Sequence, residues 1–293
     1  MAVTLSDDRR RSFTFMSAPK RIVSLVPSDS YTVWALGAGA SLVGRTDYCV
    51  EPADIGSVPS VGGTKNPRLE EIFALEPDLV LVNQEENTRS DIEKMVARGL
   101  RVYVSFPQRV ADGFAHMARL ARILHVDRDP AVKERLREAY ALLSMPSLEL
   151  TVPRRAFCPI WMKPLMTING ATYISDTLAA AGLDNAFARR DRLYPLTADL
   201  GLGDPVPAAD RDTRYPRVSV EELVEAAPDL VLLPTEPHPF TQEDEATMRA
   251  WFSQSSKMPI FVPIDGKDMC WHGAWAVHGL PRLRAAVRQL VLE

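Results

Sequence analysis

The chain has 293 residues, which is enough for one large domain or two domains of ordinary size. Hydrophobic residues make up 46% of the chain and charged residues 25%, proportions that are ordinary for a soluble globular protein. The formal net charge of −4 provides no basic surface for nucleic acid, and no apolar run approaches the roughly 18 residues of a membrane-spanning helix.

The N-terminal residues are predicted to enter the fold directly. SFTF and RIVSLV have the composition of short strands, and no basic region followed by a continuous apolar stretch marks an export signal. Cys49, Cys158 and Cys270 are odd in number and widely spaced, so neither a disulfide framework nor a metal knuckle is expected. These features favour the cytoplasm, and a periplasmic location would require that a leader had been removed.

One helix–strand unit is written twice. LEEIFALEPDLVLVNQEE at 69–86 and VEELVEAAPDLVLLPTEP at 220–237 align without a gap. In each copy an amphipathic helical pattern stops at a proline, Pro77 or Pro228, and a continuous apolar run typical of a covered parallel strand follows. A polar loop, a helix and another strand come next in both copies. The repeat predicts an α/β protein with two Rossmann-like lobes, each built on a parallel sheet.

The sequence between the copies predicts long helices. RVADGFAHMARLARILHV is followed by DPAVKERLREAYALLSMP, in which Asp129 and Pro130 are a start signal and Pro146 is a stop signal. A helix of about 17 residues spans roughly 25 Å and is long enough to join two lobes. We therefore expect an N-terminal lobe at 1–126, a single long connecting helix at 127–150 and a C-terminal lobe at 151–293.

Ligands of open α/β sheets bind beyond the carboxyl ends of the strands, so two such lobes would hold a ligand in the cleft between them. The loops expected there are VPSDS, TDYC, GGTKNP and NQEEN in the first lobe, and WMKPLM, RYPR, PTEPHPF and DMCWHGAW in the second.

Catalytic motifs are absent from these loops. There is no G-x-S-x-G, H-E-x-x-H, phosphate-binding loop or dinucleotide fingerprint. Glu85, Glu86 and Glu236 could pair for acid–base chemistry, but loop carboxylates are usually solvated. His116 and His125 lie in the helical stretch, so the first lobe has no loop histidine and a bare-ion site shared by two lobes is not predicted. The sequence thus predicts a binding protein with no catalytic cofactor.

Aromatic residues are concentrated in the predicted loops. Aromatic faces supply a large contact area with little loss of rotamer entropy, so they suit a large planar ligand. The aromatic and methionine side chains concerned are Tyr48, Trp161, Met162, Met166, Tyr215, Trp271 and Trp275.

Several segments resemble one known family. RIVSLVPSDSYTVWALGAG, the two PDLVL runs, KPLMTINGATYISDTLAAAGLDNAF, YPRVSVEEL and CWHG are similar to the helical-backbone (class III) solute-binding proteins, and most closely to the cobalamin-binding proteins of ABC importers. The likeness extends from DDRRRSFTF to the end of the chain. It implies two α/β lobes joined by one long helix, with a metal-containing macrocycle held between them.

The resemblance also implies roles for single residues. Tyr48 stands where a corrin-contacting tyrosine is expected, while Thr64, Asn83 and Tyr215 stand where relatives carry tryptophans. Trp161, Trp271 and Trp275 could compensate for those departures, although relatives often have an arginine near the last. Glu70 and Glu221 match the two exposed glutamates that dock family members onto a membrane permease.

We therefore predict a monomeric binding protein for a corrinoid such as cobalamin, acting in uptake with an ABC permease or in intracellular handling. Met166 and Glu236 complete the expected ligand contacts, and His272 is a possible axial ligand of the cobalt. Haem or a ferric siderophore is the alternative ligand, with Lys65, Lys163, Arg214 and Arg217 available to an anionic complex. An enzyme of tetrapyrrole metabolism that uses the cleft carboxylates or His272, and a sensor of ligand, are alternatives of other classes.

Overall fold

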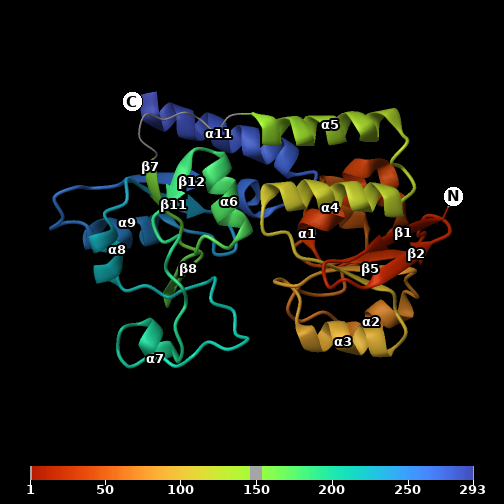
Figure 1. The fold of residues 1–293 in the computed structure, drawn as a ribbon, viewed down its shortest axis with the longest axis horizontal. Coiled ribbons are helices and arrows are strands. Elements are labelled where there is room, and N and C mark those ends of the chain that lie inside the picture. The colour runs from red at the N-terminus through yellow and green to blue at the C-terminus, as the bar shows by residue number, and fades with distance from the viewer. Residues whose placement is uncertain (1, 146–153, 293) are drawn as a thin grey trace. The chain divides into compact units, whose positions relative to one another are not determined.

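The computed structural model describes residues 2–145 and 154–292, so positions 146–150 of the expected connecting helix lie outside the described residues. The chain forms two compact units (Figure 1). The N unit consists of Met1–Ser144 together with Trp271–Val277, and the C unit consists of Met145–Cys270 and His278–Glu293. Each unit contains a four-stranded parallel sheet, which confirms the predicted α/β class with two Rossmann-like lobes.

The sheet of the N unit has the order β4-β3-β5-β6. Its strands are β3 (Ile22–Ser24), β4 (Leu42–Arg45), β5 (Leu79–Asn83) and β6 (Val102–Ser105), and an antiparallel hairpin of β1 (Val3–Ser6) and β2 (Ser12–Phe15) precedes them. The helices are α1 (Pro27–Val33), α2 (Leu69–Ala74), α3 (Arg89–Ala97), α4 (Val110–Ile123) and α5 (Pro130–Ser144), with short turns at Trp34–Ala38, Gly39–Ser41 and Ala53–Ser57. All five residues of β5 are buried, as expected for a parallel strand covered on both faces.

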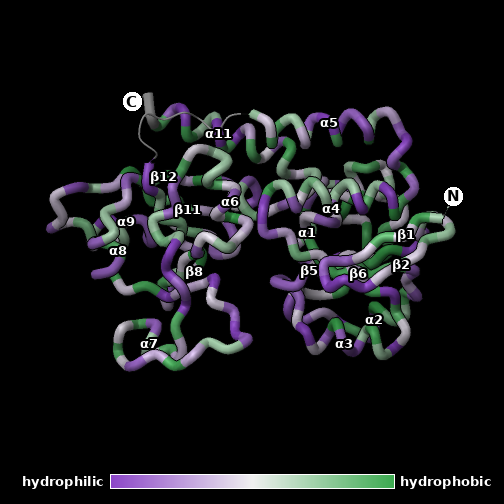
Figure 2. Tube along the Cα trace, viewed as in Figure 1, coloured by the Kyte–Doolittle hydropathy of each residue, from purple (hydrophilic) through white to green (hydrophobic). Residues whose placement is uncertain are grey.

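Helix α5 is the described part of the expected connecting helix, and it packs on α4 within the N unit. Asp129 initiates it, because its carboxylate accepts a hydrogen bond of 2.8 Å from the Ala131 N–H. Figure 2 shows α5 as a mixture of hydrophilic and hydrophobic residues, and among them only Val132 and Ala139 are buried. Tyr140, in the second half of α5, is 44% exposed.

The sheet of the C unit has the order β10-β7-β11-β12. Its strands are β7 (Arg154–Phe157), β10 (Leu183–Asn185), β11 (Leu230–Pro234) and β12 (Ile260–Ile264), and a small hairpin is formed by β8 (Trp161–Met162) and β9 (Leu165–Met166). The helices are α6 (Tyr173–Ala180), α7 (Leu196–Asp199), α8 (Val220–Ala226), α9 (Gln242–Trp251), α10 (Gly266–Cys270) and α11 (Ala276–Leu292). None of the helices in the described ranges is long and apolar enough to cross a membrane.

The repeated PDLVL sequence forms the third strand of each sheet order, β5 in one unit and β11 in the other. Its aspartate has the same role twice. Asp78 accepts hydrogen bonds from the backbone N–H groups of Lys20 (2.8 Å) and Arg21 (3.0 Å), and Asp229 accepts one of 2.7 Å from Arg155. Each aspartate therefore fastens the start of the neighbouring strand, β3 or β7, to the repeated unit. This is a physical reason for the repeat that is separate from ligand binding.

The segment Trp271–Val277 differs from the sequence-based division. It was expected within a C-terminal lobe at 151–293, but it belongs to the N unit. The Ala274 N–H donates a hydrogen bond of 3.1 Å to Thr32 Oγ1 in α1. Gly273 has φ +70°, and a Cβ there would lie 2.5 Å from the same oxygen, so glycine is needed both for the backbone conformation and for the close approach. We call Trp271–Val277 the returning segment.

Candidate ligand-binding site

The carboxyl edge of the N-unit sheet presents the loops that follow β3, β4 and β5. Tyr48, in the loop after β4, is 62% exposed. A Cβ on Gly63 would lie 3.6 Å from its ring, so the loop that carries Thr64 passes beside Tyr48. Parallel strands place their carboxyl ends on one edge, where α/β proteins bind ligands. Tyr48 and Thr64 therefore lie in neighbouring loops at this edge.

Asn83 and Asn87 shape this edge from the inside. Asn83, the last residue of β5, is only 3% exposed, and its side-chain oxygen accepts a hydrogen bond of 2.7 Å from the Glu85 N–H. Asn87 donates from its side-chain amide to the carbonyls of Leu25 (3.2 Å) and Thr64 (2.9 Å). Asn87 therefore holds three loops together, a role that no local sequence pattern indicates. Asn83 holds its own loop and its side chain is not presented to solvent.

The returning segment brings Trp271 and Trp275 onto α1. The ring of Trp275 meets those of Tyr31 and Trp271 edge-on, at centroid distances of 5.0 Å and 5.1 Å. Trp271 is 5% exposed, whereas Trp275 is half-buried. Trp271 is thus a packing residue of the N unit, contrary to its expected position on a ligand-facing loop. Part of the Trp275 side chain remains accessible to solvent.

His272 is also buried, at 3% exposure. Its Nε2 lies 3.0 Å from Ser28 Oγ, and its Nδ1 lies 3.8 Å from Asp29 Oδ1. Burial lowers the pKa of His272 to about 4, and the attraction of Asp29 offsets this only in part, so the imidazole is neutral at pH 7. Both ring nitrogens face protein groups in the interior. A corrin ring could not approach them, which argues against the predicted axial ligation of cobalt.

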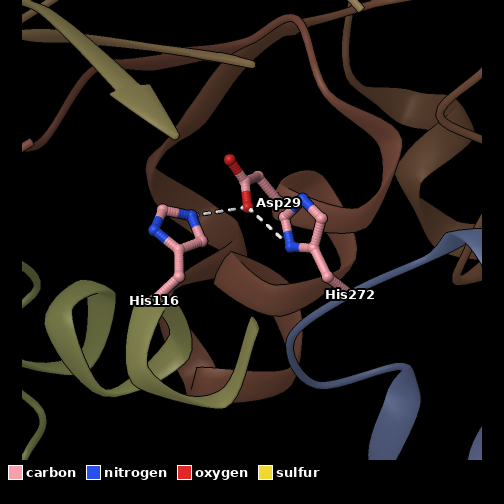
Figure 3. A group of neighbouring side chains, drawn as sticks. All are labelled: Asp29, His116 and His272. Carbon is pink, nitrogen blue, oxygen red and sulfur yellow. Dashed lines mark hydrogen bonds and ion pairs between the residues drawn. The ribbon is translucent and has the colours of Figure 1, made fainter. Parts of the chain in front are cut away.

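Asp29, His116 and His272 form a cluster inside the N unit (Figure 3). Asp29 lies in the first turn of α1, His116 in the middle of α4 and His272 on the returning segment. Asp29 Oδ1 is 2.8 Å from His116 Nε2, and both side chains are almost completely buried. Burial would raise the pKa of Asp29, but the charge of His116 and its hydrogen bond outweigh this and hold that pKa below its usual range. No sequence pattern indicates this convergence, because His116 lies on a helix whereas the predicted ligand-facing residues lie in loops.

The carboxyl edge of the C-unit sheet carries the β8–β9 hairpin, which follows β7. Trp161 is 46% exposed and is paired in register with Met166 across the hairpin. The imidazole of His238 lies edge-on to the Trp161 ring at 5.4 Å. Glu236 comes two residues earlier, in the loop after β11, and the backbone of Gly266 packs closely against it. Trp161 and Met166 of the hairpin thus lie near the loop that contains Glu236 and His238.

Tyr215 joins the same edge. Met166 pairs with Arg217 through an antiparallel bridge, and the Thr167 N–H donates a hydrogen bond of 3.0 Å to the Pro216 carbonyl. The guanidinium of Arg214 lies 5.5 Å from the centre of the Tyr215 ring. The loop that contains Tyr215 is therefore held against the β8–β9 hairpin.

Three of the four cations named as possible partners of an anionic ligand contact other groups of the protein. Arg214 donates to the Asp212 carboxylate at 2.8 Å and 2.6 Å, and Arg217 lies 3.5 Å from the buried Asp199. Lys65 donates to the Glu85 carbonyl. Each of these contacts reduces the positive charge available to an anion.

Glu70 and Glu221 occupy equivalent positions, in the first turns of α2 and α8, and both are exposed. The glutamate that follows each of them in the sequence forms ion pairs within the protein. Glu71 pairs with Arg68 at 2.6 Å, and Glu222 caps α8 and pairs with Arg190 at 2.9 Å. The two exposed carboxylates therefore lie at the same place in each copy of the repeat.

Residues 22–250 match the family model described as "Periplasmic binding protein", and the chain belongs to this family. Its members are binding proteins and not enzymes, as the absence of catalytic motifs predicted, so the alternative of a tetrapyrrole enzyme is not supported. The class III likeness that was predicted from sequence is thereby confirmed.

Similar proteins carry names that bear on the ligand. The vitamin B12-binding protein of Photorhabdus laumondii is 26% identical over 223 residues, which cover 76% of this chain and 73% of that protein. The periplasmic vitamin B12-binding protein BtuF of Vibrio cholerae has a TM-score of 0.69 at 18% identity, with 94% and 98% of the two chains covered. The periplasmic haem-binding protein RhuT of Roseiflexus has a TM-score of 0.72 at 17% identity, with 94% and 99% covered. These structural matches establish the fold.

Proposed function

We propose that this protein binds a corrinoid such as cobalamin, with the carboxyl edges of both sheets contributing contacts. The observation that supports this most is the presence of an exposed aromatic side chain on each edge, Tyr48 in the N unit and Trp161 in the C unit. Tyrosine and tryptophan combine a large apolar face with a polar group and few rotatable bonds, so an accessible ring at a ligand-binding edge suits a large planar ligand. Thr64, Met166, Tyr215, Glu236 and Trp275 are the further proposed contacts.

Asn83, Trp271 and His272 have supporting roles in this proposal. Asn83 holds the loop after β5, and Trp271 and His272 fasten the returning segment, so each positions groups that touch the ligand. The internal pairing of Arg214 and Arg217 favours an uncharged amide-rich ligand over an anionic siderophore. The names of the vitamin B12-binding relatives point to the same ligand class.

Haem is the second candidate. His238 places an imidazole beside Trp161 at the edge of the C-unit sheet, and imidazole is a common axial ligand of haem iron. A haem complex through His238 would lose its characteristic absorption bands in His238→Ala. A corrinoid held by shape and aromatic contact would tolerate that change.

The visible spectrum distinguishes these ligands. The purified protein is incubated in turn with cyanocobalamin, haemin and a ferric hydroxamate, passed through a desalting column and scanned. The proposal predicts that cyanocobalamin alone co-elutes in a stoichiometric amount. Retention of haemin or the ferric complex, with cyanocobalamin lost, would reject a corrinoid as the ligand.

We also propose that the ligand is delivered to an ABC importer permease that recognises Glu70 and Glu221. Family membership supports an extracytoplasmic location for that step, in place of the cytoplasmic one expected from the N-terminal sequence. Two exposed carboxylates at equivalent sites suit a permease with two equivalent basic patches.

A further inference from the structure

The side chains of Asp29, His116 and His272 form a cluster of metal-binding residue types, and this cluster has no direct contact role in the proposed corrinoid binding. One carboxylate and two imidazoles offer ligand atoms that all lie within 4.8 Å of one another, and all three residues are buried. They come from α1, α4 and the returning segment, so the cluster belongs to the N unit alone.

Hydrogen bonding within the cluster is incomplete. Asp29 Oδ2 is buried and has no hydrogen-bond partner among the described residues. A buried polar atom without a partner typically costs about 1–3 kcal/mol, so native proteins seldom keep one without a reason. His116 Nδ1 also has no partner among them, and a metal on Nε2 leaves that nitrogen unchanged, so only the carboxylate oxygen supports a metal. The ion pair between Asp29 and His116 uses only one oxygen of the carboxylate and one nitrogen of the ring.

We infer that this cluster binds one divalent transition-metal ion of the Zn²⁺ class. Zinc takes imidazole nitrogen and carboxylate oxygen at about 2.0–2.2 Å, which places neighbouring ligand atoms of a tetrahedral site about 3.3 Å apart. Asp29 Oδ1 lies 2.8 Å from His116 Nε2 and 3.8 Å from His272 Nδ1, and these distances bracket that separation. The ion would replace the hydrogen bond between Asp29 Oδ1 and His116 Nε2, with small shifts of the three side chains.

Ser28 provides a hydrogen-bond acceptor for the ring nitrogen of His272 that would not bind the metal. With the metal on Nδ1, His272 carries its proton on Nε2 and donates it to Ser28 Oγ, 3.0 Å away. Metal-binding histidines almost always donate the second ring N–H in this way, which fixes the tautomer. A water molecule fills the fourth position and can hydrogen-bond to Asp29 Oδ2. The Asp29 charge offsets half of the charge of the ion.

A bound metal ion would stabilise the structure of the N unit. The metal would bond α1, α4 and the returning segment together at one point, next to the hydrogen bond from Ala274 to Thr32. The site is too deeply buried for a macrocycle, so it is independent of the corrinoid. A bound ion would stabilise the docking of Trp271–Val277 onto the N unit.

The test uses the full chain after treatment with EDTA and removal of the chelator. Zn²⁺ is titrated in competition with a chromophoric chelator, and Co²⁺ is titrated as a spectroscopic probe. The inference predicts one tight Zn²⁺ per chain, visible Co²⁺ bands of a four- or five-coordinate site, and a higher melting temperature with Zn²⁺. Asp29→Asn and His272→Gln should each weaken binding by at least about 100-fold, beyond the range that changes in outer-shell groups cause.

His278→Gln is the matched control, because His278 is exposed and lies only six residues along the chain. It should bind Zn²⁺ as the unchanged protein does. Equal loss in His278→Gln, or undiminished binding in Asp29→Asn, would show adventitious surface binding and overturn the inference. If the cluster variants do not fold, the Co²⁺ spectrum of the unchanged chain decides, since an octahedral spectrum like that of aqueous Co²⁺ would equally refute the site. Cyanocobalamin binding is measured separately and does not depend on either result.

Discussion

Replacing Gly273 by alanine tests the docking of the returning segment. Gly273 has φ +70°, a conformation that costs an alanine about 1–2 kcal/mol. A Cβ would also lie 2.5 Å from Thr32 Oγ1, which is closer than such atoms approach in proteins. That oxygen cannot move easily, because it donates to the Ser28 carbonyl at 2.7 Å and accepts from the Ala274 N–H at 3.1 Å.

The cost of the backbone conformation and the cost of the clash with Thr32 Oγ1 add. Overpacking in a close-packed interior costs about 1–3 kcal/mol, so Gly273→Ala should lower the free energy of unfolding by about 2–5 kcal/mol in total. Gly99→Ala is the matched control in the same unit. Gly99 has φ +87° with no neighbouring atom within 4 Å of a Cβ, so it isolates the backbone term of about 1–2 kcal/mol.

Urea unfolding followed by circular dichroism and tryptophan fluorescence measures both variants. Thr32→Ala combined with Gly273→Ala should be less destabilising than the sum of the single changes, because the clash is removed together with the hydroxyl. Equal losses for Gly273→Ala and Gly99→Ala, or strict additivity in the double variant, would refute the close contact between the returning segment and α1.

Three further predictions follow from the site and the fold. Tyr48→Ala should weaken cyanocobalamin binding by about 1–3 kcal/mol, by analogy with stacking of bases on aromatic side chains, whereas Tyr140→Ala, at an exposed tyrosine on α5, should leave the affinity measured by calorimetry unchanged. Asp78→Ala should destabilise the protein by about 0.5–1.5 kcal/mol in urea unfolding, because two exposed backbone N–H groups exchange a carboxylate acceptor for water, and a loss within experimental error would contradict its role in fastening β3. The double change Glu70→Ala and Glu221→Ala should abolish stimulation of a reconstituted permease's ATPase while cobalamin affinity is retained, and undiminished stimulation would reject these docking residues.

The fold was predictable because the repeat carries strong local signals. The PDLVL runs are continuous apolar strands that follow proline-terminated helices, and they became β5 and β11, each the third strand of its sheet order. Ser219 and Glu222 form a capping box at the start of α8, and Gly99 follows the end of α3 with a positive φ. Each of these features depends on residues that are close together in the sequence.

The interior of the site was less predictable because it depends on contacts between distant segments. Trp271 and His272 were placed on a solvent-facing loop, since they follow β12 and α10. The chain instead returns to the N unit, where both become buried against α1. Asp29 and His116 are 87 residues apart, and no local pattern links the first turn of α1 to the middle of α4. Only the packing of the helices brings these groups together.

Isothermal titration of the purified chain with cyanocobalamin tests corrinoid binding most directly. We predict saturable binding of one molecule per chain with a Kd of about 1 μM or tighter, corresponding to about −8 kcal/mol, and a clear loss of affinity in Trp161→Ala. No saturable binding of cyanocobalamin under conditions in which haemin or a ferric siderophore saturates the same preparation would contradict corrinoid binding.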